Sequence, residues 1–270
     1  MQGDPMEQAS SWDWSVRRRA AWSQGTPEEI LSILARDPVQ WVREAVAGNP
    51  RIPEQLLASL AEDGSGFVRA AVALNTRTPP EILEMLASDE MVDFDYLLCK
   101  NRYLVREAVA RNQNASQDTV DWLARDHDEH VRAAAARNPV LTEEAMVRLS
   151  RDMSWLVRDG IASNPSTPEE LLLYLSADRI ADVRVTVASN PRTPSEALRS
   201  LARDRSREVR EAAARNPGLD GPSLEALSHD WSWRVREAVA CNPSVPAETL
   251  RRLAVDPDPS VQKAARGRLG

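Results

Sequence analysis

The sequence predicts an all-α protein built as an α-solenoid, in which pairs of short helices repeat along the chain. The first observation is a recurring segment: VREAVAGNP at Val42 returns as VREAVARN at Val105 and as VREAVACNP at Val235. The second is the interval between copies, which is 26 residues almost throughout and is typical of stacked repeats. About nine two-helix repeats are therefore expected. The looser copies begin at Val16, Val68, Val131, Val157, Val183, Val209 and Val261.

The first helix of each repeat is expected between an aspartate and an asparagine. In the second copy these are Asp37, five residues before Val42, and Asn49, seven residues after it. Asp is a strong N-cap, and the apolar positions that follow have the period of an amphipathic helix. Asn49 precedes Pro50, and a residue before proline is pushed out of the helical region. The first helix is therefore predicted to end there.

The second helix is expected to open at Thr-Pro-x-Glu, as in Thr26-Pro27-Glu28-Glu29. Thr is expected to cap this helix, Pro suits its first position, and Glu complements the positive helix end. Ile30, Leu31 and Leu34 then form a buried stripe. Helices of about ten residues cannot bury an apolar face without neighbours, so each repeat depends on the next.

The 26-residue interval is interrupted once, where 11 additional residues precede Val105. No Pro or Gly occurs between Glu81 and Pro139, and 11 residues make about three helical turns. A helical insertion near residues 94–104 is therefore expected, giving one long helix from about Glu90 to Arg111.

Composition and charge limit the function classes. With 270 residues, a single continuous solenoid is expected over residues 12–270, after a disordered tail over residues 1–11. The net charge of −7 disfavours a nucleic-acid partner. Cys99 and Cys241 form no disulfide framework, and no apolar run is long enough to span a membrane. The tail also lacks the features of a signal peptide, and together these observations predict a cytoplasmic protein.

The consensus Asp-x4-Val-Arg-x-Ala-x-Ala-x-Asn-Pro-x-Thr-Pro-x-x-x-Leu-x-x-Leu-Ala resembles the leucine-rich repeat variant family, from Val16 to the C-terminus. Its Asp-x4-Val-Arg core is also similar to HEAT repeats. The resemblance implies a right-handed helical solenoid, whose first helix is partly 3₁₀ in that family, and a scaffolding role at most. One family member carries an N-terminal cysteine cluster for an iron–sulfur centre. Residues 1–15 contain no Cys, so no cofactor is expected here.

The repeated polar residues have a functional and a structural interpretation. An exposed column of arginines would suit phosphate, and a column of amides could line a ligand groove. An equally frequent Asp column instead favours an Arg and Asp ladder between repeats, with Asn bound to the turn backbone. The structural interpretation is preferred for both columns. The ladder residues assigned in this way are Asp37, Arg43, Asn49, Asp63, Arg69, Asn75, Asp126, Arg132, Asn138, Asp152, Arg158 and Asn164.

A metal site is conceivable at Asp126-His127-Asp128-Glu129-His130, where two His lie three residues apart. A third ligand is not defined, so a solvated charged turn is preferred over a metal site. Gly-rich phosphate loops and recognisable catalytic sets are not found in the sequence. The sequence therefore predicts a protein that is not an enzyme.

Tryptophans depart from the repeat pattern. Trp14, Trp155 and Trp233 stand two residues before a repeat valine and Trp22 six after one, positions that point away from the apolar stripe. Aromatic side chains are enriched where partners dock, although these rings could instead cover the junctions between repeats. Both interpretations stay open at this point.

The favoured hypothesis is a non-enzymatic protein–protein interaction scaffold that presents a curved helical-repeat surface to another protein. One alternative is a HEAT-like nucleic-acid-binding or DNA-repair protein, and a second is a metal-binding protein or enzyme that uses the region of His127 and His130. Under the favoured hypothesis the partner-binding residues are Trp14, Trp22, Tyr96, Tyr103, Trp155 and Trp233.

Overall fold

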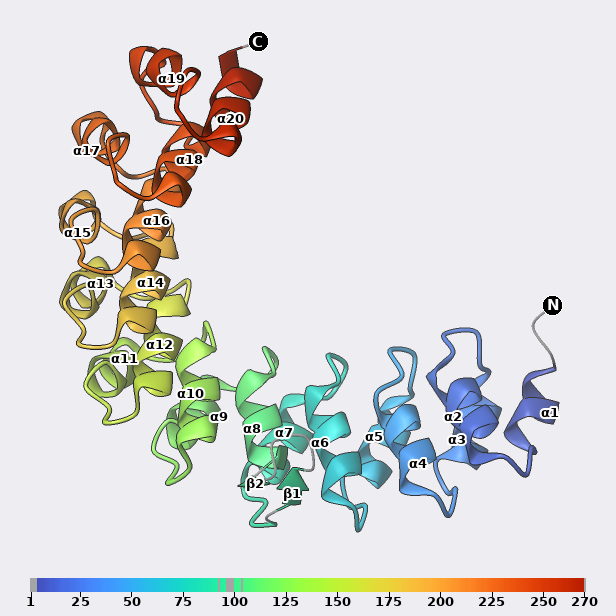
Figure 1. Ribbon diagram of the computed structural model, residues 1–270. Helices are drawn as coiled ribbons and strands as arrows, with labels where there is room; N and C mark the ends of the chain where they lie inside the picture. Colours follow the sequence, from blue (N-terminus) through green and yellow to red (C-terminus); the bar gives the residue numbers. More distant parts are fainter. Residues whose placement is uncertain (1–3, 92, 96–99, 103, 270) are drawn as a thin grey trace. The chain divides into compact units, whose positions relative to one another are not determined.

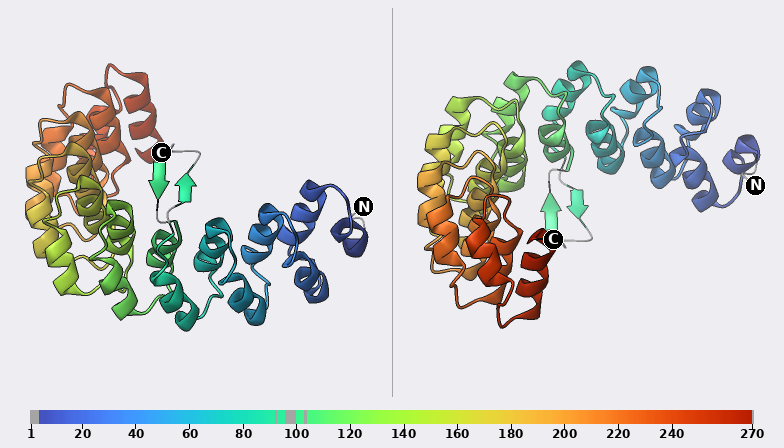
Figure 2. Two further views of the ribbon diagram at one scale, coloured as in Figure 1. Left: turned by 90° about the horizontal axis from the view of Figure 1, so that it is seen from below. Right: turned by 90° about the horizontal axis from the view of Figure 1, so that it is seen from above.

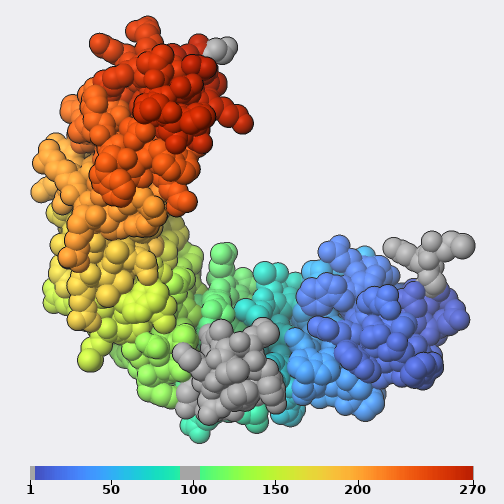
Figure 3. Space-filling model, viewed as in Figure 1, coloured from blue at the N-terminus to red at the C-terminus, as the bar shows by residue number. Residues whose placement is uncertain are grey.

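The computed structural model describes residues 4–91, 93–95, 100–102 and 104–269, which form helices and two short strands. The contacts divide the chain into two compact units, residues 1–145 (unit 1) and residues 146–270 (unit 2). Within each unit the helices follow one another in sequence order, as the gradation of colour in the space-filling view shows (Figure 3). Among the described residues, no helix combines the length and the apolar character that a membrane crossing requires.

Unit 1 has two layers of helices (Figure 1). The first helices of its repeats are α2 (Trp14–Trp22), α4 (Gln40–Ala47), α6 (Gly66–Leu74), α8 (Leu104–Arg111) and α10 (Glu129–Arg137), and they pack on one another in this order. The second helices are α3 (Glu28–Leu34), α5 (Glu54–Leu60), α7 (Pro80–Ala87) and α9 (Gln117–Leu123). Each second helix packs beside the first helices of its own and the following repeat.

Unit 2 repeats this arrangement. Its first helices are α12 (Trp155–Ser163), α14 (Ala181–Ser189), α16 (Arg207–Arg215), α18 (Trp233–Cys241) and α20 (Pro259–Leu269), again packed in order. Its second helices are α13 (Glu169–Leu175), α15 (Ser195–Leu201), α17 (Gly221–Leu227) and α19 (Ala247–Leu253). The helix α11 (Glu143–Leu149) spans the boundary between the units in the sequence. An all-α repeat architecture is thus confirmed, whereas the single continuous domain stays a prediction.

The core of each unit is the seam between its two layers. Val42, Ala45 and Val46 of α4 are buried there, as are Leu57 and Leu60 of the following helix α5. The alanines let adjacent first helices approach closely, because a small side chain leaves little bulk between the backbones. This close stacking explains why a helix of eight or nine residues is stable here although it would be marginal alone.

The first helices begin two residues later than the sequence analysis expected. Asp37 is not the N-cap of α4, which is Val39. Its Oδ1 accepts a hydrogen bond from the Val39 amide at 2.9 Å and so closes the turn before the helix. The ladder described below uses the same carboxylate, which explains why the aspartate lies outside the helix. In the described residues these helices are α-helices, without the 3₁₀ portion implied by the family resemblance.

The second helices also begin differently from the expectation. Pro27 is the N-cap of α3, and Thr26 makes no capping bond to that helix. The Thr26 hydroxyl instead donates to the Ala20 carbonyl of α2 at 2.6 Å. Thr78, Thr167 and Thr193 make the same bond in their repeats, at 2.5, 2.6 and 2.5 Å. The threonine therefore adds a second hydrogen bond to a carbonyl at the end of the first helix, which also accepts an amide of the following turn.

The predicted long helix from Glu90 to Arg111 is wrong for the described residues. The helix α8 begins only at Leu104, and the strands β1 (Asp93–Asp95) and β2 (Lys100–Arg102) precede it as an antiparallel pair. Both views in Figure 2 show this pair to one side of the helical layers of unit 1. Since α6 packs directly on α8, the insertion leaves the stack of first helices unbroken.

The N-terminal segment also differs from the expected disordered tail. Residues Pro5–Ala9 form helix α1, which contacts α2 and α3. Asp4 caps this helix through the Met6 amide at 3.0 Å, and Ala9 is buried. The helix α1 therefore covers the open end of the first repeat, as terminal repeats require.

Candidate functional site

The repeated Arg and Asp side chains form a ladder within each unit. Arg43 donates from Nε to Asp63 Oδ2 at 2.6 Å and from Nη2 to Asp63 Oδ1 at 3.0 Å. Its Nη1 donates to the carbonyl of Asp37 in its own repeat at 2.7 Å. Each arginine thus joins two repeats. The ion pairs of this kind are Arg17–Asp37, Arg43–Asp63, Arg69–Asp89, Arg106–Asp126, Arg158–Asp178, Arg184–Asp204, Arg210–Asp230 and Arg236–Asp256.

The ladder shifts the pKa of both partners towards the charged forms. Burial raises the pKa of Asp63, but the Arg43 guanidinium and the Ser65 amide lower it further, so the net shift is downward. For Asp256 the hydrogen bond from Arg236 is the largest influence and lowers the pKa. The side chains of the paired arginines are at most 19% exposed. They are therefore committed to the interfaces between repeats rather than open to phosphate.

The remaining arginine assigned to the ladder also lies against the backbone. Arg132 donates from Nη1 to the carbonyls of Asp126 and His127 at 2.8 and 3.0 Å. The backbone carbonyl of Asp152 accepts from Arg158 at 2.8 Å, and its carboxylate accepts from the Ser154 amide at 2.9 Å.

The asparagines bind the backbone of two neighbouring repeats. Asn75 donates from Nδ2 to the carbonyls of Ala47 and Asn49, at 2.7 and 3.1 Å, and its Oδ1 accepts from the Arg77 amide at 2.9 Å. Asn49 and Asn138 make the same two donor bonds within unit 1. The side chain of Asn164 accepts from the Ser166 amide at 2.8 Å. All are buried, so they do not face a ligand.

The two histidines of the 126–130 segment do not form a metal centre in the described part of the chain, where no group of three or more His, Cys, Asp or Glu side chains is placed to hold an ion. His127 is exposed, and its Nδ1 lies 3.4 Å from Asp126 Oδ1. That carboxylate is already bound by Arg106.

Exposed tryptophans are the most unusual surface feature. All eight tryptophans of the sequence are more than one-third exposed, and large aromatic side chains seldom lie so open without a partner. Tyr96 and Tyr103 lie outside the described residues. The tryptophans are Trp12, Trp14, Trp22, Trp41, Trp122, Trp155, Trp231 and Trp233.

The structure brings Trp14 and Trp22 together on α2. They stand four residues on either side of Arg18, so all three side chains share one helix face. With Ser15 and Arg19 they line a hollow of about 540 Å³. Arg18 and Arg19 are exposed, and neither makes a side-chain hydrogen bond or ion pair with a described residue. The face therefore offers two aromatic rings beside free guanidinium groups.

A second hollow, of about 280 Å³, adjoins the first and shares Arg18 and Trp22 with it. Its other walls are Glu44 and Gly48 of the α4 segment and Leu74 of α6. We call the two hollows together the aromatic groove, defined by Trp14, Arg18, Trp22, Glu44, Gly48 and Leu74.

Gly48 determines the position of Trp22. A Cβ atom at Gly48 would lie 2.6 Å from Cζ3 and 3.3 Å from Cη2 of the Trp22 ring. The ring therefore rests directly on the backbone at the end of α4, which only glycine permits. Even so, 61% of Trp22 stays exposed. The exposed part of the ring is available to a partner.

Glu44 supplies a carboxylate at the base of the aromatic groove. Burial raises its pKa and the nearby Arg18 lowers it, with a net upward shift. Its Oε2 is shielded from solvent and has no hydrogen-bond partner among the described residues. The groove thus combines an apolar wall, free arginines and one unsatisfied acceptor.

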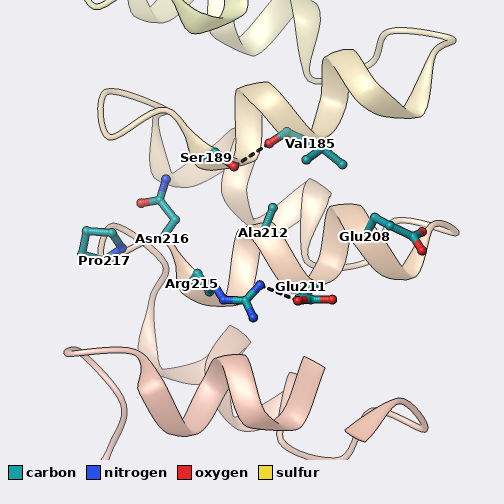
Figure 4. Close-up of a pocket in the computed structure, with 8 residues that line it drawn as sticks. All are labelled: Val185, Ser189, Glu208, Glu211, Ala212, Arg215, Asn216 and Pro217. Carbon is teal, nitrogen blue, oxygen red and sulfur yellow. Dashed lines mark hydrogen bonds and ion pairs between the residues drawn. The ribbon is translucent and has the colours of Figure 1, made fainter. Parts of the chain in front are cut away.

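The matching groove of unit 2 has a charged wall in place of an aromatic one. Between α14 and α16 lies a hollow of about 480 Å³ (Figure 4). Arg215 occupies the position that Gly48 has in unit 1, and it is ion-paired with Glu211 at 2.5 Å across the floor. Trp155 and Trp233 do not line this hollow. They lie at the starts of α12 and α18, where the Arg234 guanidinium is 5.5 Å from the ring centroid of Trp233.

Sequence reasoning missed Glu44, Gly48 and the aromatic pair Trp41 and Phe67. The rings of that pair, from successive first helices, lie 5.7 Å apart between centroids. A glycine at a position where other repeats carry a larger residue was the available signal for Gly48. Its contact with Trp22 depends on the register between repeats, which one sequence does not show.

Comparisons with known proteins agree with the repeat pattern. The family model described as leucine rich repeat variant matches residues 66–91, 181–206, 207–230 and 233–258. A solved leucine-rich repeat variant with a novel repetitive structural motif is similar at 27% identity and a TM-score of 0.57, covering 87% of this chain and 88% of its own. No curated protein matches.

Two further solved structures show weaker similarity, each at 16% identity. An engineered protein has a TM-score of 0.41, with 98% of this chain and 97% of that chain covered. The Escherichia coli protein YibA has a TM-score of 0.43, with 95% and 96% covered.

Proposed function

Because its repeats are those of the leucine-rich repeat variant family, we propose that this chain is a non-enzymatic scaffold that binds another protein through exposed aromatic side chains. The observation that carries the proposal is the aromatic groove of unit 1. Trp14 and Trp22 are exposed there although the strongly repeated polar residues are engaged in stacking. Aromatic and arginine side chains dominate the binding energy of protein interfaces, and the groove offers both. Trp155 and Trp233 are candidate contacts on unit 2.

The shape of the groove favours an apolar anchor from the partner. The Trp22 ring rests against Gly48, so the ring is held in place before a partner arrives. An apolar side chain inserted between Trp22 and Leu74 would displace water from both, and Arg18 at the rim would donate hydrogen bonds to a carboxylate or carbonyl oxygen.

Affinity capture from native extract with the full chain tests the proposal. The double variant Trp14→Ala/Trp22→Ala should lose specific partners that the unaltered protein retains. Trp122→Ala is the matched control, because Trp122 is also exposed but lies on α9 in the other layer. Retention of every partner by the double variant would contradict the proposal.

A finer variant separates ring position from ring loss. Gly48→Ala forces the Trp22 ring away from α4, so it should weaken capture while all eight tryptophans remain. Gly64→Ala is the control, since a Cβ there meets nothing within 4 Å. Equal capture by the two variants would show that the seated ring is not the binding determinant.

A further inference from the structure

Unit 2 exposes a second surface, formed by the loops that lead from a second helix into the next first helix. Each loop contains one ladder aspartate, and the residue directly after it is exposed. Going along the stack of repeats, the residues at this position are Met153, Arg179, Arg205, Trp231 and Pro257, and the first four of them form this surface. We call this surface the loop edge and include in it the neighbouring Arg203 and Trp233.

The ladder turns these side chains outward. The backbone carbonyl of Met153 accepts a bond from Arg158 at 3.2 Å, that of Arg205 from Arg210 at 3.3 Å, and that of Trp231 from Arg236 at 3.4 Å. With the backbone held on the inner side, the side chains face solvent. Met153 is 92% exposed and Trp231 is 79% exposed. Apolar side chains at such exposure, repeated at one structural position, are typical of an interaction site.

The centre of the loop edge is basic. Arg179, Arg203 and Arg205 are exposed, and none makes a side-chain hydrogen bond or ion pair with a described residue. The ladder carboxylates Asp178 and Asp204 lie in the same loops, but Arg158 and Arg184 bind them. Three guanidinium groups on two adjacent loops therefore remain available for an external anion.

Aromatic rings at the far end of the loop edge are already stacked with cations. The guanidinium of Arg210 lies 5.8 Å from the ring centroid of Trp231, and that of Arg234 lies 5.5 Å from the ring centroid of Trp233. These contacts orient the rings before binding. The loop edge is therefore apolar at Met153, basic in the middle and aromatic at Trp231 and Trp233.

Unit 1 lacks the basic centre. The same repeat position carries Trp12 in its first repeat and then Pro38, Gly64, Glu90 and His127. Unit 1 has 24 acidic and 15 Lys or Arg residues, whereas unit 2 has 17 acidic and 19 Lys or Arg residues. The basic edge is thus a property of unit 2 and is not a consequence of the repeat.

We propose that the loop edge of unit 2 binds an extended acidic peptide segment of a partner protein, with an apolar residue near each end and carboxylates between them. The length follows from the repeat. Adjacent helices pack about 8–10 Å apart, so the three repeat steps from Met153 to Trp231 span roughly 27 Å. An extended chain covers that distance in about eight or nine residues at about 3.3 Å each.

Charge distribution favours a peptide over a nucleic-acid strand. A single strand carries a phosphate at every nucleotide, whereas the loop edge offers its three free guanidinium groups only in the central part and apolar groups at the ends. The net charge of −7 would also oppose a uniformly charged polyanion more than a segment with a few carboxylates.

The test uses the full chain and a fluorescein-labelled peptide of nine residues, with leucine at each end and four glutamates and three serines between. Fluorescence anisotropy at low salt should show saturable binding. The triple variant Arg179→Gln/Arg203→Gln/Arg205→Gln should weaken it at least tenfold, and Trp231→Ala should also weaken it. The triple control Arg148→Gln/Arg192→Gln/Arg251→Gln has the same charge change on exposed arginines elsewhere in unit 2 and should change affinity less than twofold.

Three results would overturn the proposal: no binding of the peptide, equal binding of a version with glutamine for glutamate, or equal weakening by the two triple variants. Tighter binding of a labelled oligothymidylate than of the peptide would assign the loop edge to nucleic acid instead. The Trp14→Ala/Trp22→Ala variant should bind the peptide normally, so failure here is distinguishable from failure of the proposed role of the aromatic groove.

Discussion

Replacing Arg184 with glutamine should destabilise unit 2 by about 3–5 kcal/mol, the range typical for removing one partner of a buried charge pair. Arg184 is buried, and it donates to Asp204 Oδ2 at 2.7 Å, to Asp204 Oδ1 at 2.9 Å and to the Asp178 carbonyl at 2.7 Å. Glutamine is too short to make these bonds. The variant would leave the Asp204 carboxylate charged, largely buried and without its cation.

A matched control lies in the same repeat. Arg192 is exposed and makes one bond, at 3.2 Å, to the Pro165 carbonyl. Arg192→Gln should therefore change stability by less than about 0.5 kcal/mol. The double variant Arg184→Gln/Asp204→Asn should be less destabilised than the sum of its single variants, because the second change removes the orphaned charge.

Urea unfolding of the full chain, followed by far-ultraviolet circular dichroism, measures these differences. Repeat arrays can unfold in stages, so hydrogen exchange of the amides in residues 178–215 should be measured in parallel. Exchange there should accelerate in Arg184→Gln and stay unchanged in Arg192→Gln. If Arg184→Gln and Arg192→Gln differ in stability by less than about 1 kcal/mol, the ladder does not hold the repeats together and the reasoning fails.

Three further predictions concern other parts of the stack. Asn216→Ala should cost about 2–4 kcal/mol in urea unfolding, because it removes two buried hydrogen bonds to the preceding repeat and leaves the Ala188 carbonyl without the Asn216 donor. Glu225 has a pKa lowered to about 2, chiefly by the hydrogen bond from Arg252, so the native state should lose stability as pH falls from about 4.5 towards 2. Glu225→Gln should flatten that part of the stability curve measured by thermal unfolding. Excision of residues 93–103 restores the spacing Asp-x4-Val, so the shortened chain should keep its helical circular dichroism and melt cooperatively.

The positions of the helices followed from the sequence because both helix periodicity and repeat spacing are local signals. The roles of the residues at the helix ends did not. Asp37 and Thr26 are strong capping residues, and a local rule assigns them to the helix that follows. In the structure Asp37 binds Arg17 of the preceding repeat, and Thr26 binds the carbonyl of Ala20. These two side chains therefore make contacts with another helix and do not cap the helix that follows them.

The insertion before α8 shows a similar limit. An addition of 11 residues without Pro or Gly is compatible with three extra helical turns, and composition alone gave no reason to prefer strands. The ladder supplies the missing constraint. Arg106 binds the Asp89 carbonyl at 2.8 Å across the insertion, as Arg69 binds that of Asp63 at 2.7 Å. A continuous helix from Glu90 would carry these two ladder positions too far apart.

The position of each tryptophan on its helix predicted that Trp14, Trp22, Trp155 and Trp233 would be exposed. It did not predict which of them would lie together. Trp14 and Trp22 share a groove, whereas the other two lie on unit 2. Angle on a helix is set by the local sequence, while the neighbour that a side chain meets is set by the register of the next repeat. The contact of Trp22 with Gly48 is therefore visible only in the structure.

One position in the repeat determines whether a groove on the first-helix layer has an aromatic or a charged wall. In unit 1 it is Gly48, which admits the Trp22 ring, and in unit 2 it is Arg215, which lines the groove and is ion-paired with Glu211. The ladder and the asparagine bonds are made elsewhere in the repeat, so this position can vary without disturbing the stack. Separation of stacking residues from surface residues explains how nearly identical repeats can present an aromatic groove on one unit and a basic loop edge on the other.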